Sequence, residues 1–198
     1  GGGDSLIKYD HRIGESRIIS VWPEMSWAIP PRAFRYRFAW TYPIVVSSHQ
    51  EDTVYIAGNL VFKSTNEGDS WCAISPDLTR DDSTKQGVSG GSISLEGGAS
   101  DVYCTIFSLA ESPHEPGVLW TGSDDGLVHI SRDDGETWRN VTPEDMPDWI
   151  MIHKIEISPH DPATAYLAGT RYKFDDNKPY LYKTNDYGKT WSKITEGI

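Results

Sequence analysis

The sequence predicts an all-β fold assembled from repeated units of four short strands. An eight-residue phrase of the form Ser/Thr-x-Asn/Asp-x-Gly-x-Ser/Thr-Trp occurs three times, at 64–71, 131–138 and 184–191. A short apolar run precedes each copy, and the 18 glycines and 12 prolines are spread along the chain, as the turns of a β fold require. Because self-similarity at intervals of tens of residues marks a repeat architecture, the phrase defines the units.

Each copy of the phrase ends a longer unit in which four strand signals follow one another. A first apolar run ends at Ser-Ser-His or Ser-Pro-His, and a second ends at a glycine. A third run leads into the phrase, and a fourth strand begins at its tryptophan. The first and second runs lie at 43–46 and 54–58, at 105–110 and 118–122, and at 154–157 and 165–169. Four short antiparallel strands with a periodic aromatic residue are typical of a β-propeller blade.

The predicted organisation is an incomplete propeller of about three and a half blades. We expect a partial blade made of two outer strands, Ser5–Asp10 and Arg17–Trp22, and then three blades that each contain one phrase. A polar Gly/Ser-rich insert follows the first of these. The predicted segments are 1–22 for the partial blade, 35–78, 102–141 and 150–196 for the blades, and 79–101 for the insert.

The two ends of such an arc of blades are expected to need a partner. Closed propellers have typically four to eight blades, and uncovered sheet edges favour aggregation. We therefore expect this chain, which begins Gly-Gly-Gly without a methionine, to be an excerpt of a longer polypeptide. The expected partners are the remaining blades of that polypeptide or another copy of the chain.

The residue types of the phrase explain it as a β-hairpin turn. The Asn or Asp side chain accepts hydrogen bonds from backbone N–H groups just ahead of it, and the glycine reaches a positive φ that other residues adopt only at a cost. The tryptophan buries a large apolar surface between units while its indole N–H needs an acceptor. The residues with these structural roles are Asn66, Gly68 and Trp71, Asp133, Gly135 and Trp138, and Asp186, Gly188 and Trp191.

Calcium ligation or acid catalysis is the alternative interpretation of the acidic residues in the phrase. An EF-hand loop would need more carboxylates and a terminal glutamate, whereas a hairpin turn needs the spacing observed. Three histidines, His49, His114 and His160, recur after the first strand of each unit, but separate blades would place them far apart, as residues that close a turn. We therefore expect neither a metal site nor a cofactor.

The charge balance argues against nucleic acid as a partner. The formal net charge is −11, and Lys and Arg form no basic stripe of the kind that phosphate contacts need. No apolar run approaches the roughly 18 residues of a membrane span. Two cysteines, Cys72 and Cys104, make neither a disulfide framework nor a zinc site, and a single bridge between them stays an open alternative.

The phrase resembles the Asp-box, or BNR repeat, of sialidases, xyloglucan-degrading glycoside hydrolases, sortilin-type Vps10 domains and a plant-type photosystem II assembly factor. The stretches that carry a closer likeness are SPDLTRDD (75–82), YCTIFSLAESP (103–113), LWTGSDDGLVHISRDDGETW (119–138) and SPHDPATAYLAGTRYK (158–173). They are similar to large bacterial secreted proteins described as sortilin-like or as BNR-repeat glycosyl hydrolases. The resemblance covers nearly the whole chain. It implies a BNR β-propeller of seven or more blades, often in tandem, in an extracellular or periplasmic location.

The predicted topology separates the phrases from any ligand site. In a blade whose first strand lines the central channel, the turn between strands three and four lies at one end, and the links and longer inserts lie at the other. Candidate binding residues at the insert-bearing end are Arg35, Arg37, Trp40, Trp149, His153 and Arg171. Candidate acids are Asp124, Asp125, Asp148 and Asp175, with Asp101 and Asp176 in the same inserts.

A glycosidase would need two of these carboxyls across the scissile bond, about 5–5.5 Å apart for retention or about 6.5–9.5 Å for inversion. Asp124 and Asp125 are adjacent in a Ser-Asp-Asp-Gly turn, so their side chains are expected to diverge. Asp148 beside Trp149 would suit a sugar platform with an acid, and equally a loop that fills space. Asp175, Asp176 and Asn177 lie in a polar loop, where we expect them to be solvated. A sialidase would need three arginines gathered on the substrate carboxylate and a tyrosine nucleophile, and no matching amino-terminal motif occurs.

Two functions from different classes remain. The first is a segment of an exported propeller that acts as an interaction scaffold and binds polypeptide or glycan at the insert-bearing end. The alternative is a carbohydrate-active hydrolase whose catalytic pair lies wholly or partly outside this segment. We expect the scaffold, because no acid/base pair stands out once the turn residues are discounted.

Overall fold

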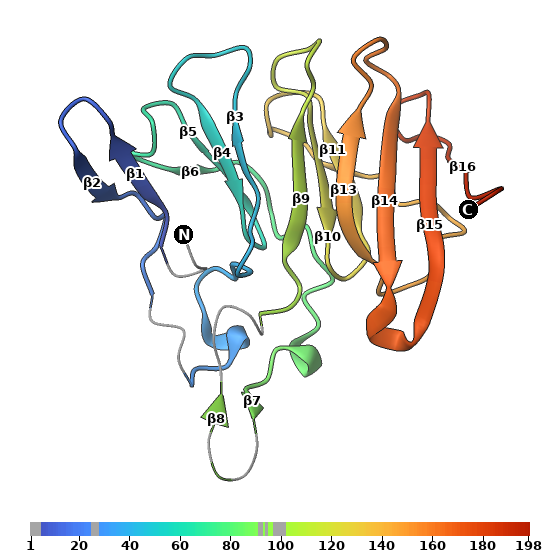
Figure 1. The fold of residues 1–198 in the computed structure, drawn as a ribbon, viewed down its shortest axis with the longest axis horizontal. Coiled ribbons are helices and arrows are strands. Elements are labelled where there is room, and N and C mark those ends of the chain that lie inside the picture. The colour runs from blue at the N-terminus through green and yellow to red at the C-terminus, as the bar shows by residue number, and fades with distance from the viewer. Residues whose placement is uncertain (1–4, 25–27, 91–92, 94, 97–101) are drawn as a thin grey trace.

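The structure is a computed structural model that describes residues 5–24, 28–90, 93, 95–96 and 102–198 (Figure 1). Its main elements are three four-stranded antiparallel sheets, which confirm the predicted propeller blades. The first blade contains β3 (Ile44–Val46), β4 (Val54–Ala57), β5 (Val61–Ser64) and β6 (Cys72–Ala73). The second contains β9 (Ile106–Glu111), β10 (Leu119–Ser123), β11 (Val128–Ser131) and β12 (Arg139–Asn140). The third contains β13 (Met151–Ile157), β14 (Ala165–Arg171), β15 (Asp176–Thr184) and β16 (Ser192–Lys193).

A partial blade precedes the three full ones (Figure 1). β1 (Ile7–Asp10) and β2 (Glu15–Ile18) pair antiparallel through a tight turn in which Gly14 has a φ of +72°. The predicted second strand, Arg17–Trp22, is therefore wrong in its bounds: the turn closes at Gly14, so the strand begins and ends earlier along the chain.

The hydrogen bonds identify β1 and β2 as the outer strands of a blade. The N–H of Ile19 donates to the carbonyl of Leu6 (2.8 Å), just as the N–H of Ile74 donates to the carbonyl of Val61 (2.9 Å) across strands three and four of the first blade. Counting back from these pairs, Ser16 stands where the phrase has its tryptophan. The partial blade therefore has the frame of strands three and four without an Asp-box of its own.

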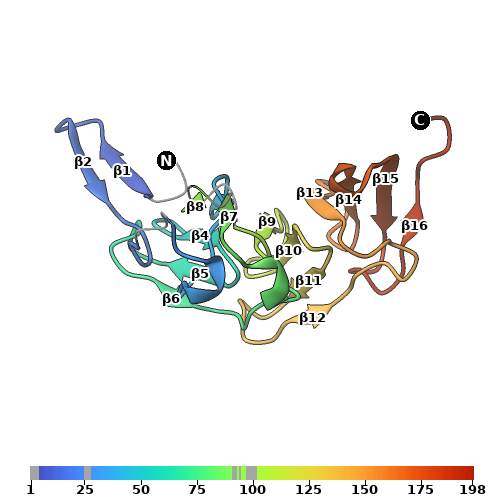
Figure 2. The ribbon, with the colours of Figure 1, turned by 90° about the horizontal axis from the view of Figure 1, so that it is seen from below.

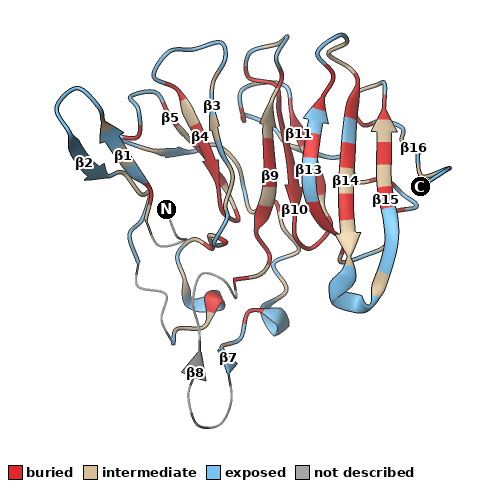
Figure 3. Cartoon of the chain, in the orientation of Figure 1, coloured by how far each residue is buried: buried red, intermediate tan, exposed pale blue. Residues whose placement is uncertain are grey.

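The blades stand side by side in an open arc (Figure 2), and the core lies between them. Each gap between neighbouring sheets is filled by one hydrophobic cluster, so the interior consists of three layers rather than one centre. Fully buried aromatic side chains mark these layers: Phe62 between the partial and first blades, Tyr55 between the first and second, and Trp120 and Tyr182 between the second and third. The strands of the partial blade stay largely exposed (Figure 3).

Each Asp-box turn is closed by the same hydrogen bonds. The Oδ1 atom of Asn66, Asp133 or Asp186 accepts the backbone N–H four residues ahead, at 2.9 Å in each copy. The two aspartates also accept the hydroxyl of the threonine at that position. These bonds, the threonine hydroxyl first, lower the pKa of Asp133 and hold the pKa of Asp186 at about 2, because they stabilise the ionised form. The carboxylates are therefore charged acceptors within their own turns.

The tryptophan of each box binds the blade before it. The indole Nε1–H of Trp71 donates to the carbonyl of Ile19 (2.7 Å), that of Trp138 to Ile74 (2.8 Å) and that of Trp191 to Val141 (2.7 Å). In each case the accepting residue follows strand four of the preceding blade. The box glycine packs on the same residue so closely that a Cβ would stand 2.5, 2.7 and 2.9 Å from it in the three copies. One turn therefore supplies both the hydrogen bond and the close packing that join two blades.

The histidines of the Ser-Ser-His and Ser-Pro-His corners also link blades, which the sequence did not indicate. Nε2 of His49 lies 2.7 Å from the carbonyl oxygen of Ser112, and Nε2 of His114 lies 3.0 Å from that of Ser158. Each accepting serine begins the corresponding corner of the next blade. The histidines lie in separate blades, and the backbone N–H of each donates to the serine hydroxyl that begins its own corner, so the contact with the next blade is an additional role. His160, in the third blade, is exposed.

The box turns lie at the opposite end of the blades from the inserts, as the strand order predicts (Figure 1). We call the end of the blades that carries the inserts the insert end. Its elements are the 3-10 helices η1 (Pro31–Ala33), η2 (Ser83–Lys85) and η4 (Tyr172–Phe174), the hairpin of β7 (Ser89–Gly90) and β8 (Leu95–Glu96), and the link 142–150.

Both cysteines are free thiols. Cys72 is exposed and Cys104 is buried, so the bridge that the sequence left open does not form. Burial raises the pKa of the Cys104 thiol to about 12. Cys104 is therefore a protonated core residue. Among the described residues, no helix is long and apolar enough to cross a membrane.

Candidate functional site

At the insert end, two aromatic rings from different parts of the chain lie together. The rings of Tyr103 and Trp149 have centroids 6.2 Å apart and planes inclined by 24°, so they stack. The Arg80 guanidinium lies 5.1 Å and the Lys85 ammonium 4.7 Å from the Trp149 ring centroid. The Lys173 ammonium lies 5.2 Å from the Tyr103 centroid. We call these five residues the insert-end cluster; it combines aromatic faces with hydrogen-bond donors.

Backbone geometry fixes the position of Trp149. This residue has a φ of +63°, a left-handed conformation that side chains with a Cβ rarely adopt. Gly126 makes room for it, since a Cβ there would lie 3.1 Å from the nitrogen of Ile150 and 3.2 Å from that of Trp149. From the third blade, Nε of Arg171 donates to the carbonyl of Asp148 (3.0 Å). The loop is therefore held on both sides before any ligand binds, which lowers the entropy lost on binding.

Arg80 ties the first insert to this loop. Its backbone N–H donates to Oδ2 of Asp125 and its Nε–H to the carbonyl of Asp125, both at 2.8 Å. Its Nη2 group donates to Oδ1 of Asp148 at 2.6 Å. Burial raises the pKa of Asp125, while hydrogen bonds from Ser123 and Arg80 oppose the rise. Two of the four candidate acids thus share one arginine.

Asp124 faces Thr105 rather than this arginine. Its side chain is 3% exposed, and its two oxygens accept the N–H and the hydroxyl of Thr105, each at 2.9 Å. Burial raises the pKa of Asp124 to about 7 against the lowering effect of these bonds. A comparable bond occurs at the first blade, where Oδ1 of Asn59 accepts the N–H of Arg37 (2.9 Å). Since an amide can accept in this way, a structural role explains Asp124.

Replacing Asp124 by asparagine is expected to remove a pH dependence of stability. With its pKa raised from 3.8 to about 7, the folded protein binds this proton more tightly than the unfolded chain does. The free energy of unfolding therefore falls as the pH rises from about 4 to about 7 and then levels off, with a contribution of roughly 2–4 kcal/mol. Urea unfolding across this interval should show the Asp124→Asn variant gaining stability relative to the parent.

The exposed Asp175 provides the control for that experiment. Asp175→Asn makes the same change of side chain at an exposed position, so it should not reproduce the gain in stability expected of Asp124→Asn. A stability difference between Asp124→Asn and the parent that stays constant over the same interval would contradict the assigned protonation.

The other candidate acids form no evident catalytic pair. Asp148 is exposed and paired with the arginine described above. Asp175 ends η4 with a left-handed φ of +55° and is exposed. The expectation that Asp176 is solvated is wrong, because its carboxylate accepts the hydroxyl of Tyr180 (2.5 Å) and pairs with Arg171. Asp101 lies outside the described residues. Within the described ranges, each candidate acid is therefore bonded to another group of the protein or open to solvent.

Arg37, a predicted binding residue, is buried. Its guanidinium pairs with Asp77 (2.6 Å) and Asp81 (2.9 Å), and its Nε–H donates to the carbonyl of Cys104 (3.2 Å). These contacts join the first blade to the insert that follows it. The prediction that Arg37 contacts a ligand is wrong, because the side chain is enclosed by structural partners.

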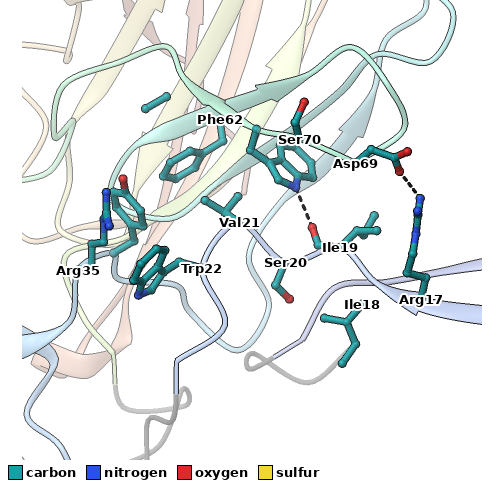
Figure 4. Close-up of a pocket in the computed structure, with 14 residues that line it drawn as sticks. Arg17, Ile18, Ile19, Ser20, Val21, Trp22, Arg35, Phe62, Asp69 and Ser70 are labelled. Atoms are coloured by element: carbon teal, nitrogen blue, oxygen red, sulfur yellow. Dashed lines mark hydrogen bonds and ion pairs between the residues drawn. The ribbon is translucent and has the colours of Figure 1, made fainter.

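Arg35 lines a cavity of about 410 Å³ between the partial and first blades (Figure 4). Its guanidinium lies 4.2 Å from the ring centroid of Trp22 and 5.4 Å from that of Tyr36. Trp71 of the first box lines the same cavity. A cavity of about 670 Å³ occupies the equivalent place between the second and third blades, beside Trp191. We therefore interpret this hollow as a regular feature of the groove between blades.

Trp40 and His153 have no ring contact with the insert-end cluster in the described part of the chain. Trp40 is 52% exposed. His153 packs edge-on against Phe107, with centroids 5.5 Å apart, and its Nε2 lies 2.9 Å from the hydroxyl of Thr170. Burial lowers the pKa of His153, and the nearby Lys173 ammonium lowers it further. Of the predicted binding residues, the structure brings only Trp149 into the cluster, with Arg171 bracing its loop.

Four members of the cluster were not predicted: Arg80, Lys85, Tyr103 and Lys173. They lie in the inserts or immediately beside them, where no strand periodicity assigns a direction to a side chain. The Asp-Trp pair at 148–149 was the one sequence signal that pointed to this place.

No family model matches the chain. By sequence it is similar to a xyloglucanase of Paenibacillus sp, with 26% identity over 190 residues, which is 87% of this chain and 17% of that protein. It is also similar to the vacuolar protein sorting/targeting protein PEP1 of Saccharomyces cerevisiae, with 43% identity over 72 residues, which is 36% of this chain and 4% of that protein. The chain thus spans a small part of the length of these relatives.

Solved structures with the same architecture include two GH74 enzymes. One is an ancestral GH74 enzyme, with a TM-score of 0.52 and 19% identity over 87% of this chain and 20% of that one. The other is a GH74 enzyme of Niastella koreensis, with a TM-score of 0.50 and 17% identity over 77% of this chain and 21% of that one. At these identities the likeness shows the fold. The chain has the fold of β-propeller blades and is similar to glycoside-hydrolase propellers, as the resemblance of its repeats predicts.

Proposed function

We propose that this chain is a glycan-binding segment of an exported β-propeller, and that its insert-end cluster binds a glucan chain of the xyloglucan type. The observation that carries the proposal is the stacked pair of Tyr103 and Trp149, with the cationic groups of Arg80 and Lys85 over the ring of Trp149. A pyranose ring has an apolar C–H face that packs on an aromatic ring, and its hydroxyls need donors and acceptors around that face. Lys85 and Arg80 supply donors, and Asp148 supplies an acceptor.

The comparisons support a glycan as the ligand. The similarity to a xyloglucanase extends over 87% of this chain, whereas the similarity to the vacuolar sorting protein covers 36%. The net charge of −11 favours a neutral ligand over an acidic one, in spite of the local cationic groups. An exported location agrees with a ligand found outside the cell.

Binding, and not hydrolysis, is the activity proposed for the described residues. A glycosidase needs one carboxyl as acid and another as nucleophile or base. Asp125 and Asp148 share one arginine, and Asp124 is enclosed against Thr105. For hydrolysis, at least one carboxyl would have to come from outside the described residues.

Trp149→Ala is expected to weaken the binding of a xyloglucan oligosaccharide roughly thirtyfold, since a half-buried aromatic anchor contributes about 2 kcal/mol to such a contact. Titration calorimetry on the parent and the variant measures the change. Trp149 belongs to none of the three hydrophobic clusters between blades, so the variant should keep the Tm of the parent.

Trp22→Ala is the matched control. Trp22 is 46% exposed and also lies against an arginine, but in the cavity between the partial and first blades. This variant should bind as the parent does. If Trp22→Ala abolishes binding while Trp149→Ala retains it, the glycan occupies the cavity and the proposal is wrong. Absence of binding by the parent protein would also contradict it.

A further inference from the structure

Neighbouring blades are joined by a contact at the fourth residue of each Asp-box, in addition to the tryptophan and glycine contacts. In the first box this residue is Glu67, and Lys8 of the partial blade pairs with it. In the second box it is Asp134, and Lys63 of the first blade pairs with it at 2.6 Å. The hydroxyl of Tyr55, also in the first blade, donates to the other oxygen of Asp134 (3.3 Å). A polar contact thus accompanies the apolar layer.

The residue that meets the fourth box position is equivalent in every blade. Lys8 and Lys63 occupy the same place on strand three, because the closing hydrogen bonds of the two hairpins align them. The second blade has Ile130 at this place, and the third box has Tyr187, which packs in the same apolar layer as Ile130. A lysine therefore meets an acid in two instances. Where strand three has an isoleucine, the fourth box residue is an uncharged tyrosine, whose ring lies 3.8 Å from the Arg132 guanidinium and whose hydroxyl donates to Glu115 (2.8 Å). The strand-three residue of one blade predicts the fourth box residue of the next.

The outer face of the third blade repeats the surface that the first blade uses. Tyr166 and Lys183 are opposite each other in the sheet, as Tyr55 and Lys63 are. In both pairs the ammonium lies 5.6 Å from the ring centroid. Ile194 follows strand four, at the place where the other blades accept the indole of the next box. The third blade therefore presents the same groups with which the first blade contacts the Asp-box of the blade that follows it.

This face is uncovered. Tyr166 is 40% exposed, whereas its counterpart Tyr55 is 1% exposed. Ile194 is 39% exposed, and His160 is exposed as well, although the two equivalent histidines reach the next blade. Within the described ranges Lys183 forms no ion pair. Each group of the repeated contact is present and lacks its partner from a following blade.

We propose that this face, formed by His160, Tyr166, Lys183 and Ile194, binds a further Asp-box blade whose fourth box residue is Asp or Glu. In that contact the box tryptophan donates to the carbonyl of Ile194, and the box glycine packs on its side chain. The carboxylate pairs with Lys183 and accepts the hydroxyl of Tyr166, while a corner carbonyl of the new blade meets His160. The inference concerns how the arc of blades continues, and it is independent of the proposed glycan binding.

A second copy of this chain does not supply such a blade. Its first two boxes already pair with its own lysines, and Tyr187 of the third packs against its own apolar layer and donates its hydroxyl to its own Glu115 (2.8 Å). Its partial blade has Ile13 and Ser16 at the positions of the box glycine and tryptophan. This hairpin can neither approach Ile194 closely nor donate an indole N–H to its carbonyl. The occupant is therefore a separate Asp-box blade, and not another copy of the chain.

A tandem protein tests the pairing rule. Residues 142–198 joined directly after Ile194 would place a copy of the third blade, with its natural link, against this face. The copy presents Tyr187 to Lys183, which is a mismatch. Changing the copied Tyr187 to Asp should raise the Tm by about 1–4 °C, and Lys183→Ile with the tyrosine retained should raise it similarly. With both changes, an isoleucine faces an aspartate, which is again a mismatch. The Tm of this protein should therefore return to that of the unchanged tandem protein.

Equal Tm values for the four tandem proteins, or the highest value for the double change, would overturn the proposal. The same rule is measured in the chain itself, in case the added blade does not fold. There, Lys63→Glu should lower the Tm by about 1–4 °C, and the further change Asp134→Lys should restore most of the loss. If Asp134→Lys restores none of the Tm lost in Lys63→Glu, then the strand-three residue does not pair with the fourth box residue of the next blade, and the proposal is wrong.

Discussion

Replacing Gly135 by alanine is expected to lower the free energy of unfolding by about 2–5 kcal/mol. Gly135 has a φ of +91°, where a residue with a Cβ is strained by roughly 1–3 kcal/mol. The new Cβ would also stand 2.7 Å from the carbonyl oxygen and 2.8 Å from the Cβ of Ile74 in the preceding blade. Because these atoms belong to the backbone or lie next to it, relief of the overlap requires the two blades to separate.

Gly197→Ala separates the two causes. Gly197 also has a positive φ, +87°, but nothing lies within 4 Å of the place its Cβ would take. Its substitution therefore introduces backbone strain alone and should cost about 1 kcal/mol or less near the exposed end of the chain. Urea unfolding followed by tryptophan fluorescence compares the variants. Equal losses of stability would contradict the role of the box glycine in packing blades together.

Trp138→Ala is expected to destabilise the protein by about 2–4 kcal/mol. The indole packs in the layer between the first and second blades, and its N–H is bonded to the carbonyl of Ile74 at 2.8 Å. Trp138→Phe keeps most of the ring contact but removes the donor, so we expect a loss of about 1–2 kcal/mol. Chemical unfolding of the two variants therefore separates packing from hydrogen bonding.

Trp149→Ala is the matched tryptophan control for this series, because Trp149 is half-buried at the insert end and outside the layers between blades. It should leave the free energy of unfolding within about 1 kcal/mol of the parent. A loss as large as that of Trp138→Ala would mean that the box tryptophans have no special part in joining blades.

The repeated phrase was enough to predict the blades, because its requirements are local. A carboxylate or amide acceptor, a glycine with positive φ and a tryptophan recur at fixed spacing, and the turn they form has the same hydrogen bonds each time. Strand order then placed the boxes and the inserts at opposite ends. The partial blade was also predicted, although its second strand was placed too late.

The candidate site could be predicted only in part, because its members come together through tertiary structure. Trp149 stood out beside Asp148, but nothing in the sequence joins Tyr103 or Arg80 to them. Arg37 looked equally available and is buried, because Asp77 and Asp81 from the following insert enclose it. Loop residues carry no periodicity, so their directions follow from contacts that a sequence does not reveal.

The contacts between blades could likewise not be predicted from the sequence, because they depend on which residues of neighbouring blades face each other. The sequence shows Lys63 and Asp134 in different units, and their pairing appears only when strand three of one blade faces the box of the next. Once that register is known, Lys8 and Glu67 give a second instance, and Lys183 stands at the third equivalent place. The residues of these pairs are all present in the sequence, but the structure is needed to show that strand three of one blade is aligned with the Asp-box of the next.

Hydrogen exchange with and without a xyloglucan oligosaccharide tests most directly whether the boxes join blades while the insert end binds glycan. We expect added protection of backbone amides at 79–85, 103–105 and 148–150, with unchanged exchange in the three boxes, because ligand contacts slow local opening where they occur. Protection confined to 64–71, 131–138 or 184–191, with none at the insert end, would contradict this assignment of the two ends.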